Sequence, residues 1–129
     1  MVIDTSAIIA ILANEPDALE IARAIEAASV RRISAATLLE TAIVVETRHG
    51  LVGGEKLDQF VNSASVQIEP VTAEQSAIAR LAFRLYGKGH HPAGLNYGDC
   101  FAYALAKAVG EPLLFKGNDF VHTDVGTVT

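Results

Sequence analysis

The sequence predicts an α/β protein in which a mainly parallel central sheet of about four to five strands is covered by helices on both faces. Short apolar runs suited to strands recur at residues 2–3, 33–35, 66–71 and 113–115. The segments between them have the apolar spacing of helices, and lie at residues 5–13, 17–28, 36–48, 53–63, 73–86 and 97–109. This alternation favours parallel strands joined by helical crossovers.

Three segments carry further expectations. Gly50 is expected to end the helix at residues 36–48. The tail at residues 120–129 is expected to add an edge strand. The helix at residues 73–86 is expected to face the core through an apolar stripe that consists of Ile78, Leu81, Ala82 and Leu85.

The composition indicates a single cytoplasmic domain that spans residues 1–129. Half of the residues are apolar, yet no apolar stretch reaches the ~18 residues of a membrane span or resembles a signal peptide. The formal net charge of −5 argues against binding nucleic acid by charge alone, although metal ions can bridge carboxylates to phosphate. The single cysteine, Cys100, excludes an internal disulfide and is interpreted as a small buried hydrophobe rather than a nucleophile.

The first strand leads directly into a candidate acid. Asp4 follows the apolar pair at residues 2–3, and a helix begins immediately after it, capped by Thr5 or Ser6. In open α/β sheets, ligands bind at the carboxyl ends of the strands. A carboxylate beside a buried core is also costly without compensation. Asp4 is therefore a candidate functional residue, although helix capping would also explain an aspartate at this place.

Three more acids fall at matching junctions. Glu40 and Asp99 lie in the first turns of their expected helices, where a negative charge is favoured. For Glu40 the alternative is a capping box with Thr37. Asp119 follows the last strand and repeats the arrangement of Asp4. In the predicted fold these positions share one edge of the sheet, so the four carboxylates are expected to form one pocket.

Carboxylates that share a pocket repel one another, and a hard divalent cation removes that conflict. Ligands that are all oxygen atoms favour Mg²⁺ or Mn²⁺ over zinc. Such a site suits phosphodiester hydrolysis, because the metal polarises the phosphate, generates hydroxide from water and stabilises the leaving oxygen. Four further residues are candidates for positioning substrate or phosphate, namely Thr5, Ser6, Asn118 and Lys116.

Four segments that together follow the whole chain resemble the PIN-domain ribonucleases, and among them the VapC toxins of bacterial type II toxin–antitoxin pairs. These segments read MVIDTSAIIAIL at the start, SAATLLETAIVV around Glu40, NYGDCFAYALA around Asp99 and LLFKGNDF before the tail. The opening segment and the one around Asp99 are together specific to the family. The resemblance implies a PIN-domain fold and a metal-dependent endoribonuclease that cuts transfer RNA or ribosomal RNA.

The family's acidic quartet carries over to Asp4, Glu40, Asp99 and Asp119. The resemblance also implies Mg²⁺ or Mn²⁺ as cofactor, a homodimer or a larger toxin–antitoxin assembly, and a VapB-like antitoxin that inhibits the enzyme. The fourth acid varies in the family, so Asp124 is an alternative to Asp119. We expect Asp4 and Asp99 to be the principal metal ligands, Glu40 to orient or deprotonate the attacking water or to hold a second metal through water, and the fourth acid to complete the shell.

An acidic chain also needs a local basic rim to hold RNA, for which the candidates are Arg48, Lys88, His90 and Lys116. Two other classes of function compete with a nuclease. One is a non-catalytic PIN-like module that only binds RNA or a protein. The other is a phosphoacceptor receiver domain, which would need adjacent acids after its first strand, whereas Asp4 stands alone.

Overall fold

The computed structural model describes residues 1–128 of the chain and contains a parallel sheet of four strands in the order β3-β2-β1-β4. The strands are β1 (Val2–Ile3), β2 (Arg32–Ser34), β3 (Gln67–Glu69) and β4 (Leu113–Leu114). Every neighbouring pair in this sheet is parallel. The predicted α/β class is therefore confirmed, and the strands are very short.

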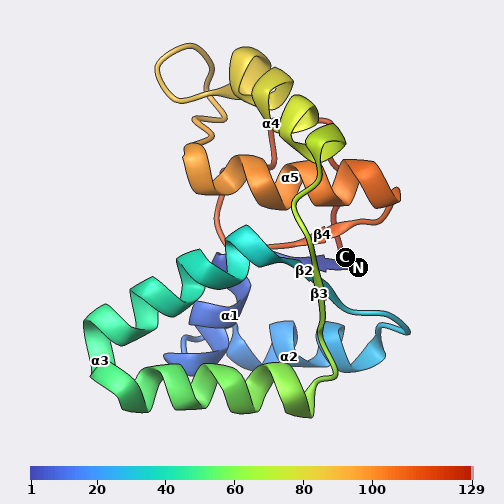
Figure 1. Cartoon of the computed structure of the whole chain (residues 1–129). Helices are drawn as coiled ribbons and strands as arrows, with labels where there is room; N and C mark the ends of the chain where they lie inside the picture. The colour runs from blue at the N-terminus through green and yellow to red at the C-terminus, as the bar shows by residue number, and fades with distance from the viewer. Residues whose placement is uncertain (129) are drawn as a thin grey trace.

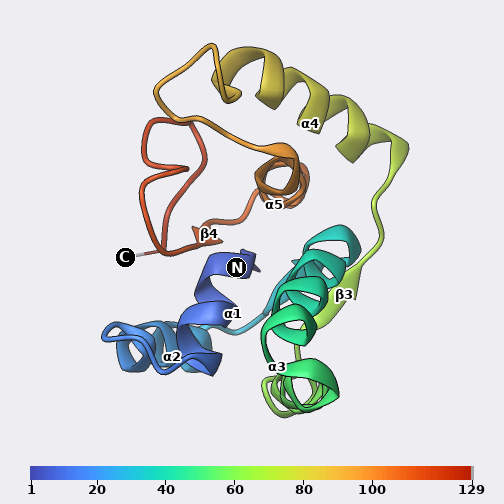
Figure 2. The ribbon, with the colours of Figure 1, turned by 90° about the vertical axis from the view of Figure 1, so that its left-hand side faces the viewer.

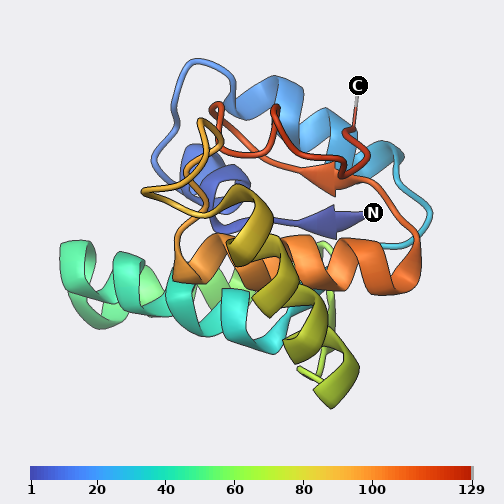
Figure 3. The same cartoon turned by 90° about the horizontal axis from the view of Figure 1, so that it is seen from above.

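Helices cover both faces of the sheet (Figure 1). They are α1 (Thr5–Leu12), α2 (Ala18–Ala27), α3 (Ala35–Ser63), α4 (Ala73–Tyr86) and α5 (Tyr97–Val109). Figure 3 shows the same layers from above, with α5 alongside the sheet and α4 outside α5. None of the helices within residues 1–128 combines the length and the apolar character needed to cross a bilayer.

The strands place alternate side chains in two separate cores, as the pleat of a strand requires. On β1, Ile3 packs with α1, α2 and α3, whereas Val2 packs with α4 and α5. On β4, Leu114 lies in the same core as Ile3, and Leu113 lies in the same core as Val2. All four side chains are almost completely buried, so two residues per strand are enough to join the layers.

The long helix α3 consists of the two helices that the sequence predicts, joined at a kink (Figure 2). Gly50 has φ 65° and ψ −155° at this kink, a conformation that is nearly confined to glycine. The second half then turns back so closely that a Cβ atom on Gly53 would lie 2.5 Å from the carbonyl oxygen of Val45. The kink therefore depends on two glycines, one for its backbone angles and one for its close packing.

Helix α4 confirms two of the four residues predicted to face the core, Ile78 and Ala82, and exposes the other two. Leu81 and Leu85 are about half exposed, whereas Ala82 is buried. Ile78, Ala79 and Tyr86 pack beside Ala82 against the core of α5. Small residues on this face allow α4 and α5 to approach each other. The two stripes have the same helical spacing, so periodicity alone did not show which one α5 would cover.

The tail forms less sheet than expected. Its pairing with the sheet is a single parallel bridge between Thr127 and Leu113, rather than an edge strand. The side chains of Val125 and Phe120 are nevertheless buried in the core beneath α5. Residue 129 of the predicted edge strand lies outside the described residues.

The kink in α3 yields a prediction about stability. Gly50→Ala is expected to lower the free energy of unfolding by about 1–3 kcal/mol, because alanine is strained at these backbone angles. Urea denaturation followed by circular dichroism measures the change. Gly54→Ala is the matched control, since Gly54 is helical and a Cβ there meets only the flexible end of Glu46. Equal stability of Gly50→Ala and wild type would contradict the role of Gly50.

Candidate functional site

Asp4 joins the end of β1 to the start of α1 and is 4% exposed. Its Oδ2 atom accepts hydrogen bonds from the backbone N–H of Ser6 at 3.0 Å and from the Ser6 hydroxyl at 2.6 Å. Asp4 is therefore itself the N-cap of α1, and the prediction that Thr5 or Ser6 caps this helix is wrong. Burial raises the pKa of the Asp4 carboxyl, and the nearby charge of Glu40 raises it further, although the bonds from Ser6 act against this.

Asp99 lies in the first turn of α5, as predicted, and is 8% exposed. It forms a capping box with Asn96, in which Asp99 Oδ2 accepts from the Asn96 N–H at 3.0 Å and Asn96 Oδ1 accepts from the Asp99 N–H at 2.9 Å. Burial raises the pKa of Asp99 to about 7, and the charges of Asp4, Asp119 and Glu40 add to the shift. Because three carboxylates act on Asp99, the four acids share one electrostatic environment.

Glu40 sits one turn further along its helix than the sequence predicts. Helix α3 is capped by Ser34, whose hydroxyl accepts from the Ala36 N–H at 3.2 Å, so Glu40 falls in the second turn rather than the first. The capping-box alternative with Thr37 is therefore wrong. Instead, Glu40 Oε1 accepts a hydrogen bond of 2.6 Å from the hydroxyl of Thr5 at the start of α1.

Asp119 and Asp124, the two candidates for the fourth acid, have different surroundings. Asp119 is exposed in the segment after β4, and its charge acts on Asp99. Asp124 instead accepts a hydrogen bond from the Tyr103 hydroxyl and pairs with the Lys107 ammonium at 3.1 Å. The Tyr103 bond and then the Lys107 charge hold the pKa of Asp124 below its usual range. The geometry therefore favours Asp119 as the fourth member of the acidic pocket.

Ser6 and Lys116 connect the two strand ends that carry Asp4 and Asp119. The backbone N–H of Lys116 donates to Ser6 Oγ at 2.9 Å, so Ser6 bridges α1 to the end of β4. The Lys116 ammonium pairs with Glu15 and, at 3.2 Å, with Asp17. Its charge is thus shared with two carboxylates of the loop between α1 and α2, which counts against its predicted contact with phosphate.

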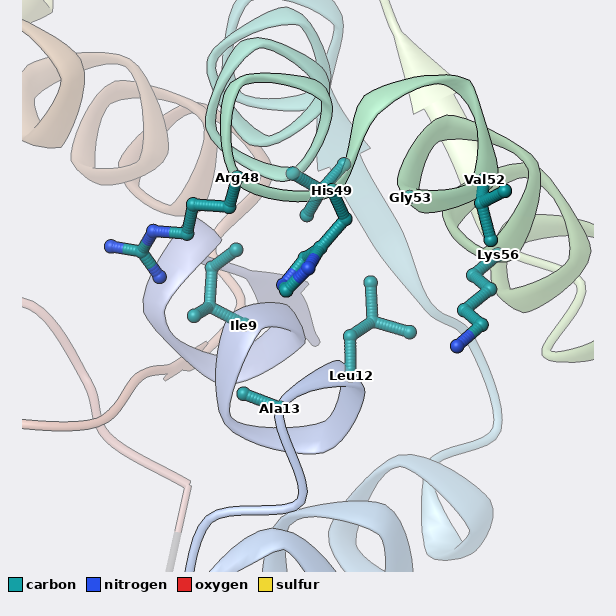
Figure 4. Close-up of a pocket in the computed structure, with 9 residues that line it drawn as sticks. Ile9, Leu12, Ala13, Arg48, His49, Val52, Gly53 and Lys56 are labelled. Carbon is teal, nitrogen blue, oxygen red and sulfur yellow. The ribbon is translucent and has the colours of Figure 1, made fainter.

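The other residues predicted for the basic rim lie in two places. His90 packs edge-on against Phe83 with ring centroids 5.4 Å apart, and Lys88 is exposed near it. Arg48 lines a cavity of about 510 Å³ between α1 and the two halves of α3. Figure 4 shows Arg48 and Lys56 at the margins of this cavity, with His49 directed toward α1.

Cys100 is buried behind Asp99 and does not supply a nucleophile. It is 5% exposed, and burial raises the pKa of its thiol to about 11, with a further contribution from Asp99. A thiol with this pKa remains protonated near neutral pH. Its interpretation as a small hydrophobe is confirmed.

The acidic pocket fits a hard divalent cation by the chemistry of its ligands. Asp4, Glu40, Asp99 and Asp119 supply carboxylate oxygens, and Ser6 adds a hydroxyl. Within residues 1–128, no three His, Cys, Asp or Glu side chains lie close enough to enclose a metal by themselves. Mg²⁺ usually keeps several waters and binds only one or two carboxylates, so Asp4 and Asp99 are the candidate ligands among these acids.

Comparison with known proteins decides the family. The sequence profile of the PIN domain matches residues 1–126. The chain belongs to the PIN-domain family. It is 58% identical to the ribonuclease VapC of Mycolicibacterium smegmatis over 99% of both chains. It is 56% identical to ribonuclease VapC30 of Mycobacterium tuberculosis over 99% of this chain and 98% of the relative.

Solved structures of PIN-domain toxins share its fold. VapC20 of Mycobacterium tuberculosis, described as a toxin that cleaves the sarcin–ricin loop, superposes with a TM-score of 0.78 at 20% identity, over 96% of this chain and 95% of that chain. VapBC2 of Rickettsia felis bound to promoter DNA gives a TM-score of 0.77 at 14% identity, over 99% and 96%. The resemblance to VapC toxins is thus confirmed, and a receiver domain is excluded.

Two residues at the pocket of this PIN domain were missed by sequence reasoning. Gly98 lies against the carboxylate of Glu40, and Thr41 lies behind Thr5. Gly98 directly precedes Asp99, and a glycine inside a helix pattern signals a close approach. Thr41 has no such signal, because a buried threonine in an apolar helix is an ordinary core residue.

The raised pKa of Asp99 predicts how pH affects the stability of the metal-free PIN domain. The folded carboxyl keeps its proton up to about pH 7, whereas the unfolded one loses it near 3.8, so stability falls as pH rises between these values. Asp99→Asn keeps an oxygen for the Asn96 N–H and removes the charge. The free energy of unfolding of the variant is expected to exceed that of wild type by roughly 1–3 kcal/mol at pH 8, and by less near pH 4.

Urea denaturation in a chelator at both pH values measures this difference. Asp124→Asn is the contrasting control, because it removes a carboxylate whose pKa is lowered and should reduce stability at neutral pH. An Asp99→Asn protein that is less stable than wild type at pH 8 would show that Asp99 is chiefly a structural cap.

Proposed function

We propose that this PIN domain is a metal-dependent endoribonuclease toxin that hydrolyses phosphodiester bonds in RNA. The observation that carries the proposal is a buried carboxyl, Asp99, on which the charges of Asp4, Asp119 and Glu40 act; burial and then these charges raise its pKa to about 7. Groups that are buried and mutually repelling in this way cost stability, and such arrangements are typical of functional sites. The relatives that are named ribonucleases support the same activity.

The chemistry requires a divalent cation, for which Mg²⁺ or Mn²⁺ fits the oxygen ligands. When bound, the cation would polarise the phosphate and lower the pKa of a water molecule. Asp4 and Asp99 would hold it. Glu40 is hydrogen-bonded to Thr5 and partly exposed, and it would accept a proton from the attacking water. Asp119 would add a fourth carboxylate at the solvent-exposed side of the acidic pocket.

The substrate class follows from the relatives rather than from the pocket. The structural neighbour VapC20 is described as cleaving the sarcin–ricin loop, which supports ribosomal RNA, or another structured RNA such as transfer RNA, as substrate. An RNA substrate of this class implies that the protein acts in the cytoplasm. Another structural neighbour, from Klebsiella pneumoniae, is described as a toxin–antitoxin complex, which supports a VapB-like antitoxin as the partner that restrains the activity.

Apolar side chains beside the pocket support a homodimer. Leu39 is 61% exposed, Ile43 is 58% exposed and Tyr97 is 80% exposed. With Glu40 and Gly98 they line one cavity of about 320 Å³ between α3 and α5. Apolar residues gathered in this way mark an interaction surface, and a second copy would bring two acidic pockets near each other.

Leu39→Glu is expected to shift the antitoxin-free protein from dimer to monomer, because it places a charge in this apolar surface. Size-exclusion chromatography with light scattering measures the mass. Leu51→Glu is the matched control, since Leu51 is 79% exposed on the far half of α3 and is expected to leave the dimer intact. A wild-type monomer, or a Leu39→Glu dimer, would refute this surface.

Cleavage of purified total RNA and transfer RNA by the antitoxin-free protein tests the activity. Discrete fragments are expected with Mg²⁺ or Mn²⁺ and are expected to vanish with a chelator. Asp99→Asn is expected to reduce the rate at least about a hundredfold while the protein remains folded. Cleavage that persists in the chelator would contradict metal dependence. A folded protein that binds RNA without cutting it would instead support the non-catalytic PIN-like module.

A further inference from the structure

The carboxylate of Glu40 is held by two elements other than its own helix. From α1, the Thr5 hydroxyl donates to Glu40 Oε1 at 2.6 Å. Thr5 directly follows Asp4, so the residue that binds Glu40 is fixed to the first acid of the pocket. A shift of α1 would therefore move both acids together.

A second threonine lies behind the first. Thr41 is fully buried, and its hydroxyl lies 2.9 Å from Thr5 Oγ1 and 2.8 Å from the carbonyl oxygen of Thr37. The single hydroxyl hydrogen of Thr41 can be donated to only one of these two oxygens, whereas the Thr5 hydroxyl donates its own hydrogen to Glu40. Thr41 therefore supports Thr5 from the core side, as a polar neighbour of its hydroxyl.

The other side of Glu40 is bounded by the backbone of α5. A Cβ atom on Gly98 would lie 1.9 Å from Glu40 Oε2 and 2.6 Å from its Cδ atom, distances that no real side chain tolerates. Any residue larger than glycine would therefore push the carboxylate out of place. Since Gly98 is bonded to Asp99, the close approach brings Glu40 beside the acid whose pKa its charge helps to raise.

We propose that Thr5 and Gly98 are positioning residues for Glu40, with Thr41 supporting Thr5. The sequence suggested a different role for Thr5, as a residue that positions substrate or phosphate. In the structure, its hydroxyl hydrogen points to a carboxylate of the enzyme instead. The inference rests on the proposed nuclease function, in which Glu40 acts on the attacking water.

The expected consequence is a loss of rate without a loss of RNA binding. A group that transfers a proton must lie within hydrogen-bond reach of it, and a displacement of about 1 Å can cost about a hundredfold in rate. RNA affinity depends mainly on phosphate contacts elsewhere on the surface. Disturbing Glu40 should therefore lower kcat and leave KM nearly unchanged.

Three variants test this with a defined RNA substrate and saturating Mg²⁺. Thr5→Val, which keeps the shape and removes the hydroxyl, is expected to lower kcat about ten- to a hundredfold. Thr5→Ser, which restores a hydroxyl, is expected to recover most of the rate. Gly98→Ala is expected to lower kcat to a similar extent, because the displaced atoms belong to a flexible side chain and the fold can remain intact.

Gly126→Ala is the matched glycine control, since a Cβ there meets Pro112 only at ordinary contact distance. Melting temperatures check that each variant is folded at the assay temperature. Wild-type kcat in Thr5→Val or in Gly98→Ala would overturn the proposal, as would a Thr5→Ser protein as slow as Thr5→Val. A rise in KM with unchanged kcat in Thr5→Val would indicate instead that Thr5 binds substrate.

Crystal structures of Thr5→Val and Gly98→Ala give a readout that does not depend on activity. In both, the Glu40 carboxylate is expected to leave the first turn of α5, while Asp4 and Asp99 stay in place. An unmoved Glu40 would refute the inference even for an active enzyme. If wild type cleaves no RNA, the proposed function fails, and these structures still decide whether Thr5 and Gly98 place Glu40.

Discussion

Repulsion among carboxylates at one edge of the sheet is the constraint on which the rest of the structure depends. Asp4 and Asp99 are almost completely buried, and each is acted on by the charge of Glu40. Such a pocket is unfavourable for folding unless something else holds its members. In this chain, helix N-termini, short hydrogen bonds and close backbone contacts supply that support, and a divalent cation would remove the conflict.

The two buried acids of the pocket are also the residues that cap helices. Asp4 caps α1 through Ser6, and Asp99 forms a capping box with Asn96. The N–H groups at a helix start bind a carboxylate without neutralising it, so the acid is held in place while its charge still acts on the pocket. Capping alone would explain an aspartate at either position. An aspartate that served only as a helix cap would not need to be buried beside other acids.

The two cores explain how so small a sheet carries such a site. Val2 and Ile3 belong to different cores, as do Leu113 and Leu114, so each strand is anchored on both faces. The chain leaves β1 and β4 at the same edge, where Asp4 and the segment with Asp119 begin. Asp4 directly follows its anchored strand, whereas Asp119 lies in the exposed segment after β4.

The sequence by itself determined the fold class, the family and the positions of Asp4 and Asp99, because strand and helix boundaries are local signals that short motifs carry. It did not determine how Glu40 is held, since its contacts with Thr5 and Gly98 join segments far apart in the chain. The choice of Asp119 over Asp124 likewise required the tertiary structure. Only packing shows that Tyr103 and Lys107 already bind Asp124, which no local pattern records.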